Sequence, residues 1–235
     1  MDAETSAGIK QTAKRIRDAL QQGIYVVINP FVRLMIRCGV TPNMVTTIGM
    51  LGNLAAAVVM VMAGYEAGQT GIIPYGKLTL AGFLIIGFSL FDMLDGQVAR
   101  LGNMTSTFGA MYDSVLDRYC ELLTLGGVSY FFLMAGNIWG ALVTYLAVIG
   151  SLMVSYVRAR AEGLGLECKI GFMQRPERVV VTAVCTLGAG ILGGYGVEWA
   201  DWVLFGGMAV IAIFANLTAA ARIEYSRRQL QKSGK

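Results

Sequence analysis

Four aspartates fall within or beside two strongly apolar stretches of the chain. Asp92 and Asp95 lie in LFDMLDGQVARLG, and Asp113 and Asp117 lie in STFGAMYDSVLDRYCELL. Charged side chains within apolar segments are costly and by default indicate function. On helices, spacings of three and four residues place each pair on one face. Two antiparallel helices joined by a short loop would bring all four carboxylates together near one end of a bundle.

Carboxylates that face one another need compensation, because their charges repel and raise their affinity for protons. The chain contains no histidine, which excludes Ser-His-Asp and Cys-His catalysis and histidine-ligated metals. Oxygen-only ligands suit hard cations. We therefore expect a pair of Mg²⁺ ions in each site, with Mn²⁺ as an alternative, and a carboxylate as general base. The competing interpretation is that the aspartates form buried salt bridges with Arg100, Arg118 and Arg158.

The composition indicates a membrane protein. The chain of 235 residues is 55% hydrophobic and 14% charged, with a mean hydropathy of +0.59, whereas soluble domains carry about 25% charged residues. We predict an all-α integral membrane protein with six transmembrane helices, each near the roughly 20 residues needed to cross a bilayer. The predicted spans are 43–64, 78–99, 108–134, 138–157, 178–196 and 202–222.

Three regions follow from this pattern. Residues 1–40 form an amphipathic interfacial segment, in which 24–40 is a helix lying in the headgroup plane. Residues 41–226 form the six-helix domain, and 227–235 form a basic cytoplasmic tail. With a cytoplasmic N-terminus, Lys77 is the one basic residue in the outer loops. The positive-inside rule thus places both termini and the aspartates on the cytoplasmic side of the cell membrane.

The full pattern D-x2-D-G-x2-A-R-x8-G-x3-D-x3-D, from Asp92 to Asp117, resembles the signature of the CDP-alcohol phosphotransferase family. That resemblance implies transfer of a phosphatidyl group from CDP-diacylglycerol to an alcohol, release of CMP, and a homodimer. It also implies that Asp92, Asp95 and Asp113 bind one metal, that Asp113 and Asp117 bind a second, and that Asp117 accepts the proton. The implied contacts to the CDP-lipid are Pro42, Asn43, Met44, Val45, Gly96, Arg100 and Ser106.

Five arginines lie at the same predicted level as the aspartates: Arg158, Arg160, Arg175, Arg178 and Arg222. Some of them could anchor spans at the membrane surface, but together they favour a pocket for an anion, and so a phosphorylated acceptor. The segments SYVRARAEGLG and IGFMQRPERVV resemble the prokaryotic phosphatidylinositol-phosphate synthases within the family. This implies inositol 1-phosphate as acceptor, with its phosphate bound by Arg158, Arg175 and Arg222.

Other functions fit parts of this pattern. A phosphatidylglycerol-phosphate synthase also needs an anionic acceptor site, and family members that use ether-lipid donors have a similar sequence. A divalent-cation transporter would also carry aspartates within spans, although such sites tend to lie near the bilayer midplane. We expect a lipid bilayer around the protein and no nucleic-acid partner.

Overall fold

The structure is a computed structural model that describes residues 28–232, apart from the side chain of Asp92. The first 27 residues, which include much of the predicted interfacial segment, and the last three of the basic tail lie outside the described residues. Over the described range the chain is helical and has no strand, so the predicted all-α class is confirmed. The helices are α2 (Pro42–Thr70), α3 (Tyr75–Ser89), α4 (Phe91–Leu101), α5 (Thr107–Met134), α6 (Ile138–Gly163), α7 (Arg175–Gly194) and α8 (Ala200–Lys232).

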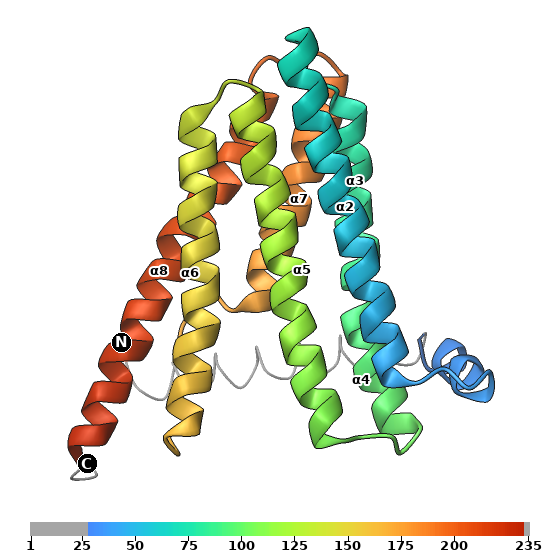
Figure 1. The fold of residues 1–235 in the computed structure, drawn as a ribbon, viewed down its shortest axis with the longest axis vertical. Helices are drawn as coiled ribbons and strands as arrows, with labels where there is room; N and C mark the ends of the chain where they lie inside the picture. Colours follow the sequence, from blue (N-terminus) through green and yellow to red (C-terminus); the bar gives the residue numbers. More distant parts are fainter. Residues whose placement is uncertain (1–27, 233–235) are drawn as a thin grey trace, which may run out of the picture.

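Figure 1 shows these helices running up and down one bundle, with α4 at its lower end. The described residues contain five segments long and apolar enough to cross a membrane: α2, α3 with α4, α6, α7 and α8. α5 has 28 residues but is not among them, and it carries four charged side chains between Asp113 and Glu121. The multi-pass architecture is confirmed, whereas the sixth span stays a prediction.

The predicted single span 78–99 is divided in the structure. α3 ends at Ser89 and α4 begins at Phe91. Leu90 between them keeps helical backbone angles (φ −68°, ψ −23°), and its carbonyl accepts hydrogen bonds from the amides of both Met93 and Leu94. The chain therefore continues in much the same direction, and the first two aspartates of the motif belong to a short helix of 11 residues.

The described part of the predicted interfacial segment is helical from residue 28 to 37. Figure 1 shows this helix at the side of the bundle, near its lower end and beside α4. Its Val32 is fully buried against Val45 of α2 and Val98 of α4, while Phe31 and Leu34 are exposed. A turn follows, in which the Thr41 hydroxyl accepts a hydrogen bond from the Met44 amide (3.4 Å) and Pro42 begins α2.

Small residues set the distances between helices. A Cβ atom added to Gly82 of α3 would lie 2.7 Å from the Leu187 backbone of α7, and one added to Gly190 of α7 would lie 2.3 Å from the Thr79 amide nitrogen of α3. The two backbones therefore touch, as in other small-residue interfaces between membrane helices. The larger pattern is that α2 packs against α3 and α5, α6 against α5 and α8, and α7 against α3 and α8.

Candidate active site

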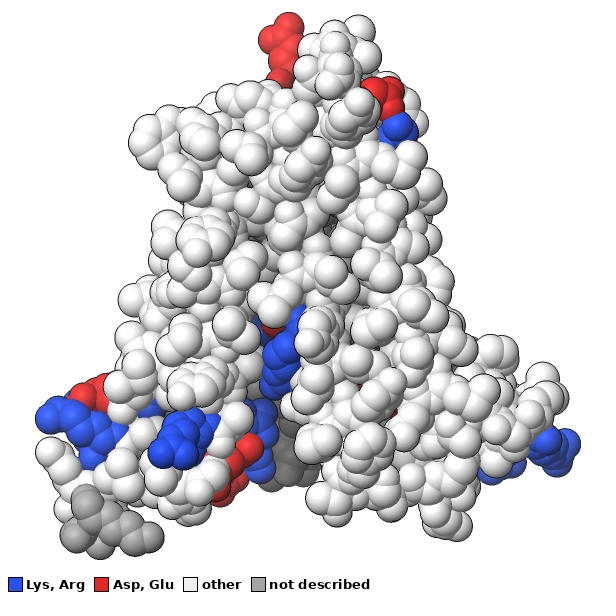
Figure 2. Space-filling model, in the orientation of Figure 1, with Lys and Arg blue, Asp and Glu red and all other residues white. Residues whose placement is uncertain are grey.

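Two cavities lie at the polar end of the bundle, where Figure 2 shows Lys and Arg side chains gathered. The first, which we call the α4 cavity, has a volume of about 210 Å³ and lies between α4, the starts of α2 and α5, and the loop before α5. Five of the seven predicted CDP-lipid contacts line it: Pro42, Asn43, Gly96, Arg100 and Ser106. Met44 is half-exposed and Val45 is fully buried in the apolar cluster with Val32, and neither lines the cavity.

Asp95 lies in the wall of the α4 cavity, is buried, and is oriented by a residue of α2 that the motif does not contain. The Thr46 hydroxyl donates a hydrogen bond to Asp95 Oδ2 (2.7 Å). Outer partners of this kind fix the direction of a ligand carboxylate. A signal for Thr46 was present in the sequence, because it lies one helical turn after Pro42 and thus on the same face of α2.

Ser106 caps the first turn of α5. Its hydroxyl accepts a hydrogen bond from the Gly109 amide (2.9 Å), which satisfies one of the unpaired amides at the helix start. A Cβ atom at Gly109 would lie 3.0 Å from the Ser106 hydroxyl and 3.4 Å from Asn43 Oδ1. The small residue in the motif therefore keeps α5 close to the start of α2.

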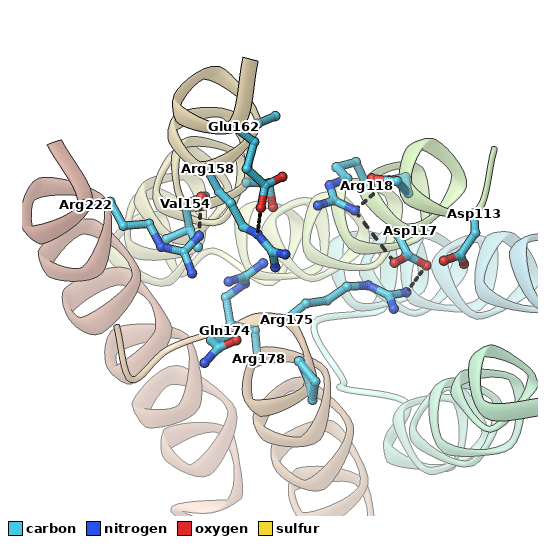
Figure 3. Close-up of a pocket in the computed structure, with 14 residues that line it drawn as sticks. Asp113, Asp117, Arg118, Val154, Arg158, Glu162, Gln174, Arg175, Arg178 and Arg222 are labelled. Carbon is cyan, nitrogen blue, oxygen red and sulfur yellow. Dashed lines mark hydrogen bonds and ion pairs between the residues drawn. The ribbon is translucent and has the colours of Figure 1, made fainter. Parts of the chain in front are cut away.

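The second cavity, the α7 cavity, has a volume of about 460 Å³ and is lined by residues of α5, α6, α7 and α8. The three predicted acceptor arginines, Arg158, Arg175 and Arg222, all line it, and Arg160 does not. Figure 3 shows these three arginines coming from three different helices around one space, with Asp113 and Asp117 on α5 at its side. The structure thus brings together residues separated by more than 100 positions in the sequence.

Asp117 is held by two cations. Arg175 Nη2 lies 2.8 Å from Asp117 Oδ1, and Arg118 Nη1 lies 3.7 Å from Asp117 Oδ2 (Figure 3). The contact between Asp117 and Arg118 is one of the ion pairs that the competing interpretation expected. Arg158, in contrast, pairs with Glu162 on its own helix (2.9 Å), so its partner is not an aspartate of the motif.

Arg222 is nearly fully buried and is bound by backbone oxygens. Its Nε donates to the Ile170 carbonyl (2.8 Å) and its Nη1 to the Val154 carbonyl (2.6 Å). Carbonyl groups fix the guanidinium without removing its net charge. Arg222 therefore contributes a fixed positive charge to the α7 cavity.

Sequence reasoning did not single out the ion pair that links α5 and α7 in the wall of the α7 cavity. Arg178 and Glu121 form a two-point salt bridge, with one contact of 2.9 Å between Arg178 Nη2 and Glu121 Oε2, and both side chains are buried. Arg178 also donates to the Met173 carbonyl (3.0 Å). Spacing offered a signal, since Glu121 follows Asp117 by four residues and Arg178 follows Arg175 by three.

Asp113 lines both cavities and so marks the point where they meet. It shares the α4 cavity with Asp95 and the α7 cavity with Asp117. Oxygen donors alone fit a hard divalent cation. Among the described side chains, no three acids or cysteines come close enough together to hold a metal. Since the side chain of Asp92 is not described, the predicted metal ligands stay a prediction.

An α-helical bundle of several membrane-length helices, with an acidic site at one polar end, defines a multi-pass membrane protein. Residues 39–214 match the CDP-alcohol phosphatidyltransferase family. The chain belongs to that family, whose members are transferases, and the resemblance seen in the aspartate motif is confirmed.

Individual relatives cover most of the chain. It is 32% identical over 205 residues to the phosphatidylinositol phosphate synthase of Mycobacteroides abscessus (86% of this chain, 84% of the relative). It is 34% identical over 195 residues to the archaetidylinositol phosphate synthase of Methanothermobacter thermautotrophicus (83% and 87%). Among solved structures, it resembles the Mycobacterium tuberculosis phosphatidylinositol phosphate synthase in complex with manganese and citrate (TM-score 0.72, 29% identity, 84% and 87% covered). It also resembles the same enzyme with CDP-DAG bound (TM-score 0.70, 29% identity, 84% and 92% covered).

Proposed function

We propose that this chain transfers the phosphatidyl group of CDP-diacylglycerol to inositol 1-phosphate, forming phosphatidylinositol phosphate and CMP. The observation that carries the proposal is the pair of cavities that meet at Asp113. One holds residues of the CDP-alcohol motif, and the other holds three arginines suited to a phosphate. The relatives named above are a phosphatidylinositol phosphate synthase and an archaetidylinositol phosphate synthase, which supports inositol 1-phosphate over other anionic acceptors.

In this reaction, the acceptor hydroxyl oxygen forms a bond to the phosphorus that carries diacylglycerol. The bond from that phosphorus to the oxygen of CMP breaks, and CMP leaves with the electron pair. Asp117 faces the α7 cavity and would take the hydroxyl proton. Arg100 would bind the diphosphate from the α4 cavity.

Asp92, Asp95, Asp113 and Asp117 would hold the divalent cations, which we propose to be a pair of Mg²⁺ ions with Mn²⁺ as a substitute. Bound there, they would neutralise charge on the diphosphate and on the departing CMP. The manganese in the M. tuberculosis relative supports a divalent cation. Thr46 and Ser106 would keep the acidic wall and the start of α5 in place.

The decisive experiment is CMP release by the purified protein in detergent, with CDP-diacylglycerol, Mg²⁺ and one acceptor at a time. We expect turnover with inositol 1-phosphate and none with inositol. Turnover with glycerol 3-phosphate alone would replace the proposed acceptor, and preference for an ether-linked CDP-lipid would replace the donor. Metal flux into liposomes without any CMP release would favour a transporter.

Two variants of α6 separate acceptor binding from general surface charge. Arg158→Gln removes a cation from the α7 cavity and should raise the KM for inositol 1-phosphate at least tenfold. Arg160→Gln removes a nearby exposed cation that does not line the cavity and should leave KM unchanged. Equal effects of the two changes would contradict the assigned acceptor site.

Asp117→Asn should abolish transfer while CDP-diacylglycerol still binds, because the α4 cavity does not include Asp117.

We further propose that the polar end faces the cytoplasm, since every described Lys and Arg except Lys77 belongs to that predicted side. Cysteine labelling from each side of sealed vesicles would test the orientation. The homodimer implied by the family can be tested by the mass of the detergent-solubilised protein.

A further inference from the structure

We propose that Arg175 has two alternating partners: Asp117, as in this structure, and the acceptor phosphate once a divalent cation occupies Asp117. Binding of the phosphorylated acceptor would therefore depend on prior binding of the metal. This inference rests on the proposed function and adds the order in which its ligands bind: the metal first, then the phosphorylated acceptor.

The starting observation is the contact of 2.8 Å between Arg175 Nη2 and Asp117 Oδ1. The two side chains are only 21% and 12% exposed, so water weakens their attraction less than it would at an open surface. This ion pair places the positive charge of Arg175 at Asp117 Oδ1. A divalent cation at Asp117 would compete for the same oxygen and would also repel the guanidinium.

Arg175 is placed to exchange partners without movement of its helix. It is the first residue of α7 and lines the α7 cavity. Figure 3 shows its side chain lying between Arg158 and Asp117. One turn further along, the buried pair of Arg178 and Glu121 fixes α7 to α5. Rotation of the flexible Arg175 side chain would therefore suffice to bring its guanidinium from the carboxylate to a phosphate in the cavity.

The charges of the α7 cavity explain why this release matters. Arg158 is paired with Glu162, and Arg175 is paired with Asp117. Arg222 is bound by carbonyls and keeps its net charge. Release of Arg175 from Asp117 by a metal would let its guanidinium join Arg222 at a phosphate in the α7 cavity. A phosphate is then bound by two guanidinium groups, the arrangement that gives strong charge-assisted hydrogen bonds.

The test is acceptor binding in the absence of CDP-lipid, so that no turnover takes place. Inositol 1-phosphate is titrated by calorimetry into the purified full chain in EDTA and in Mg²⁺. We expect binding to the unaltered protein to be at least tenfold tighter in Mg²⁺. Asp117→Asn, which removes the charged partner of Arg175, should bind the acceptor with equal affinity in both buffers and more tightly than the unaltered protein in EDTA.

Arg118→Gln is the matched control, because it removes the other cation near Asp117 and leaves the contact with Arg175 in place. It should retain the dependence on Mg²⁺. Equal affinity of the unaltered protein in the two buffers would overturn the inference. Weak binding to Asp117→Asn in both buffers would also overturn it, since removal of the charged partner would then not make Arg175 available to the phosphate.

A second measurement needs no variant. Phenylglyoxal modifies accessible arginines, and mass spectrometry reports the modification of each one. Mg²⁺ should increase the labelling of Arg175 several-fold and leave that of the buried Arg178 unchanged; no increase at Arg175 would contradict the exchange. If glycerol 3-phosphate binds and inositol 1-phosphate does not, the proposed acceptor is wrong, and the same titrations with glycerol 3-phosphate still test Arg175.

Discussion

Glu121→Gln is expected to destabilise the protein by about 3–5 kcal/mol, the cost of removing one partner of a buried ion pair. This range applies because the side chains of Arg178 and Glu121 are only 1% and 6% exposed. The amide replaces the carboxylate at nearly the same volume, so no large cavity contributes. What remains is a buried guanidinium whose other hydrogen bond goes to the neutral Met173 carbonyl.

Thermal unfolding in detergent, followed by the fraction of protein that stays monodisperse, measures this effect. For a chain of this size each kcal/mol corresponds to roughly 2–4 °C, so the melting temperature should fall by about 6–20 °C. Glu66→Gln is the control, because its ion pair with Lys77 at the opposite end is 43% and 34% exposed and contributes about 0–1 kcal/mol. The double variant Glu121→Leu with Arg178→Met should recover most of the loss, since it leaves no buried charge. A melting temperature for Glu121→Gln no lower than that of Glu66→Gln would refute this account of the pair.

Three further changes probe the helix contacts and the α4 cavity. Gly190→Ala forces a methyl group against the α3 backbone and should lower the free energy of unfolding by about 1–3 kcal/mol. Gly194→Ala is the control, because no atom lies within 4 Å of its new Cβ, and it should melt like the unaltered protein. Similar melting of both variants would contradict the close helix contact. Thr46→Val removes the hydrogen bond to Asp95 and should weaken Mn²⁺ binding about 10–100-fold, as measured by electron paramagnetic resonance. Unchanged affinity for Mn²⁺ would show that Thr46 does not orient a metal ligand. Ser106→Ala removes the cap of α5 and should lower the stability of the helix by about 0.5–2 kcal/mol. Amide exchange in the first turn of α5 should then be faster, and unchanged exchange would contradict the capping role.

The parts of the fold that follow from local pattern were predictable from the sequence. Uninterrupted apolar stretches located most helices, and the predicted start of the first span at residue 43 lies one residue from the start of α2 at Pro42. The break at Leu90 was not predictable, because no proline or glycine stands there and the residue keeps helical angles. The length of α8 was underestimated, since its polar continuation to Lys232 has no apolar signal.

The candidate site was predictable to the extent that its residues share a helix face. The spacing of the motif brought Asp95 and Asp113 to one cavity, as expected. The partners of those residues depend on how distant helices pack, which spacing within one helix does not determine. Three contacts depend on helix packing in this way and could not be predicted. They are the hydrogen bond from Thr46 to Asp95, the ion pair of Arg175 with Asp117, and the ion pair of Arg178 with Glu121.

The position of Asp113 in the walls of both cavities has a kinetic consequence. The two cavities are lined by successive turns of α5, and Asp113 is the one residue that lines both. Donor and acceptor would therefore occupy separate volumes and be present at the same time, with no need for the protein to store the transferred group on one of its own side chains. Initial rates at varied concentrations of both substrates should then give intersecting lines in double-reciprocal plots. Parallel lines, the mark of a covalent enzyme intermediate, are not expected for this architecture.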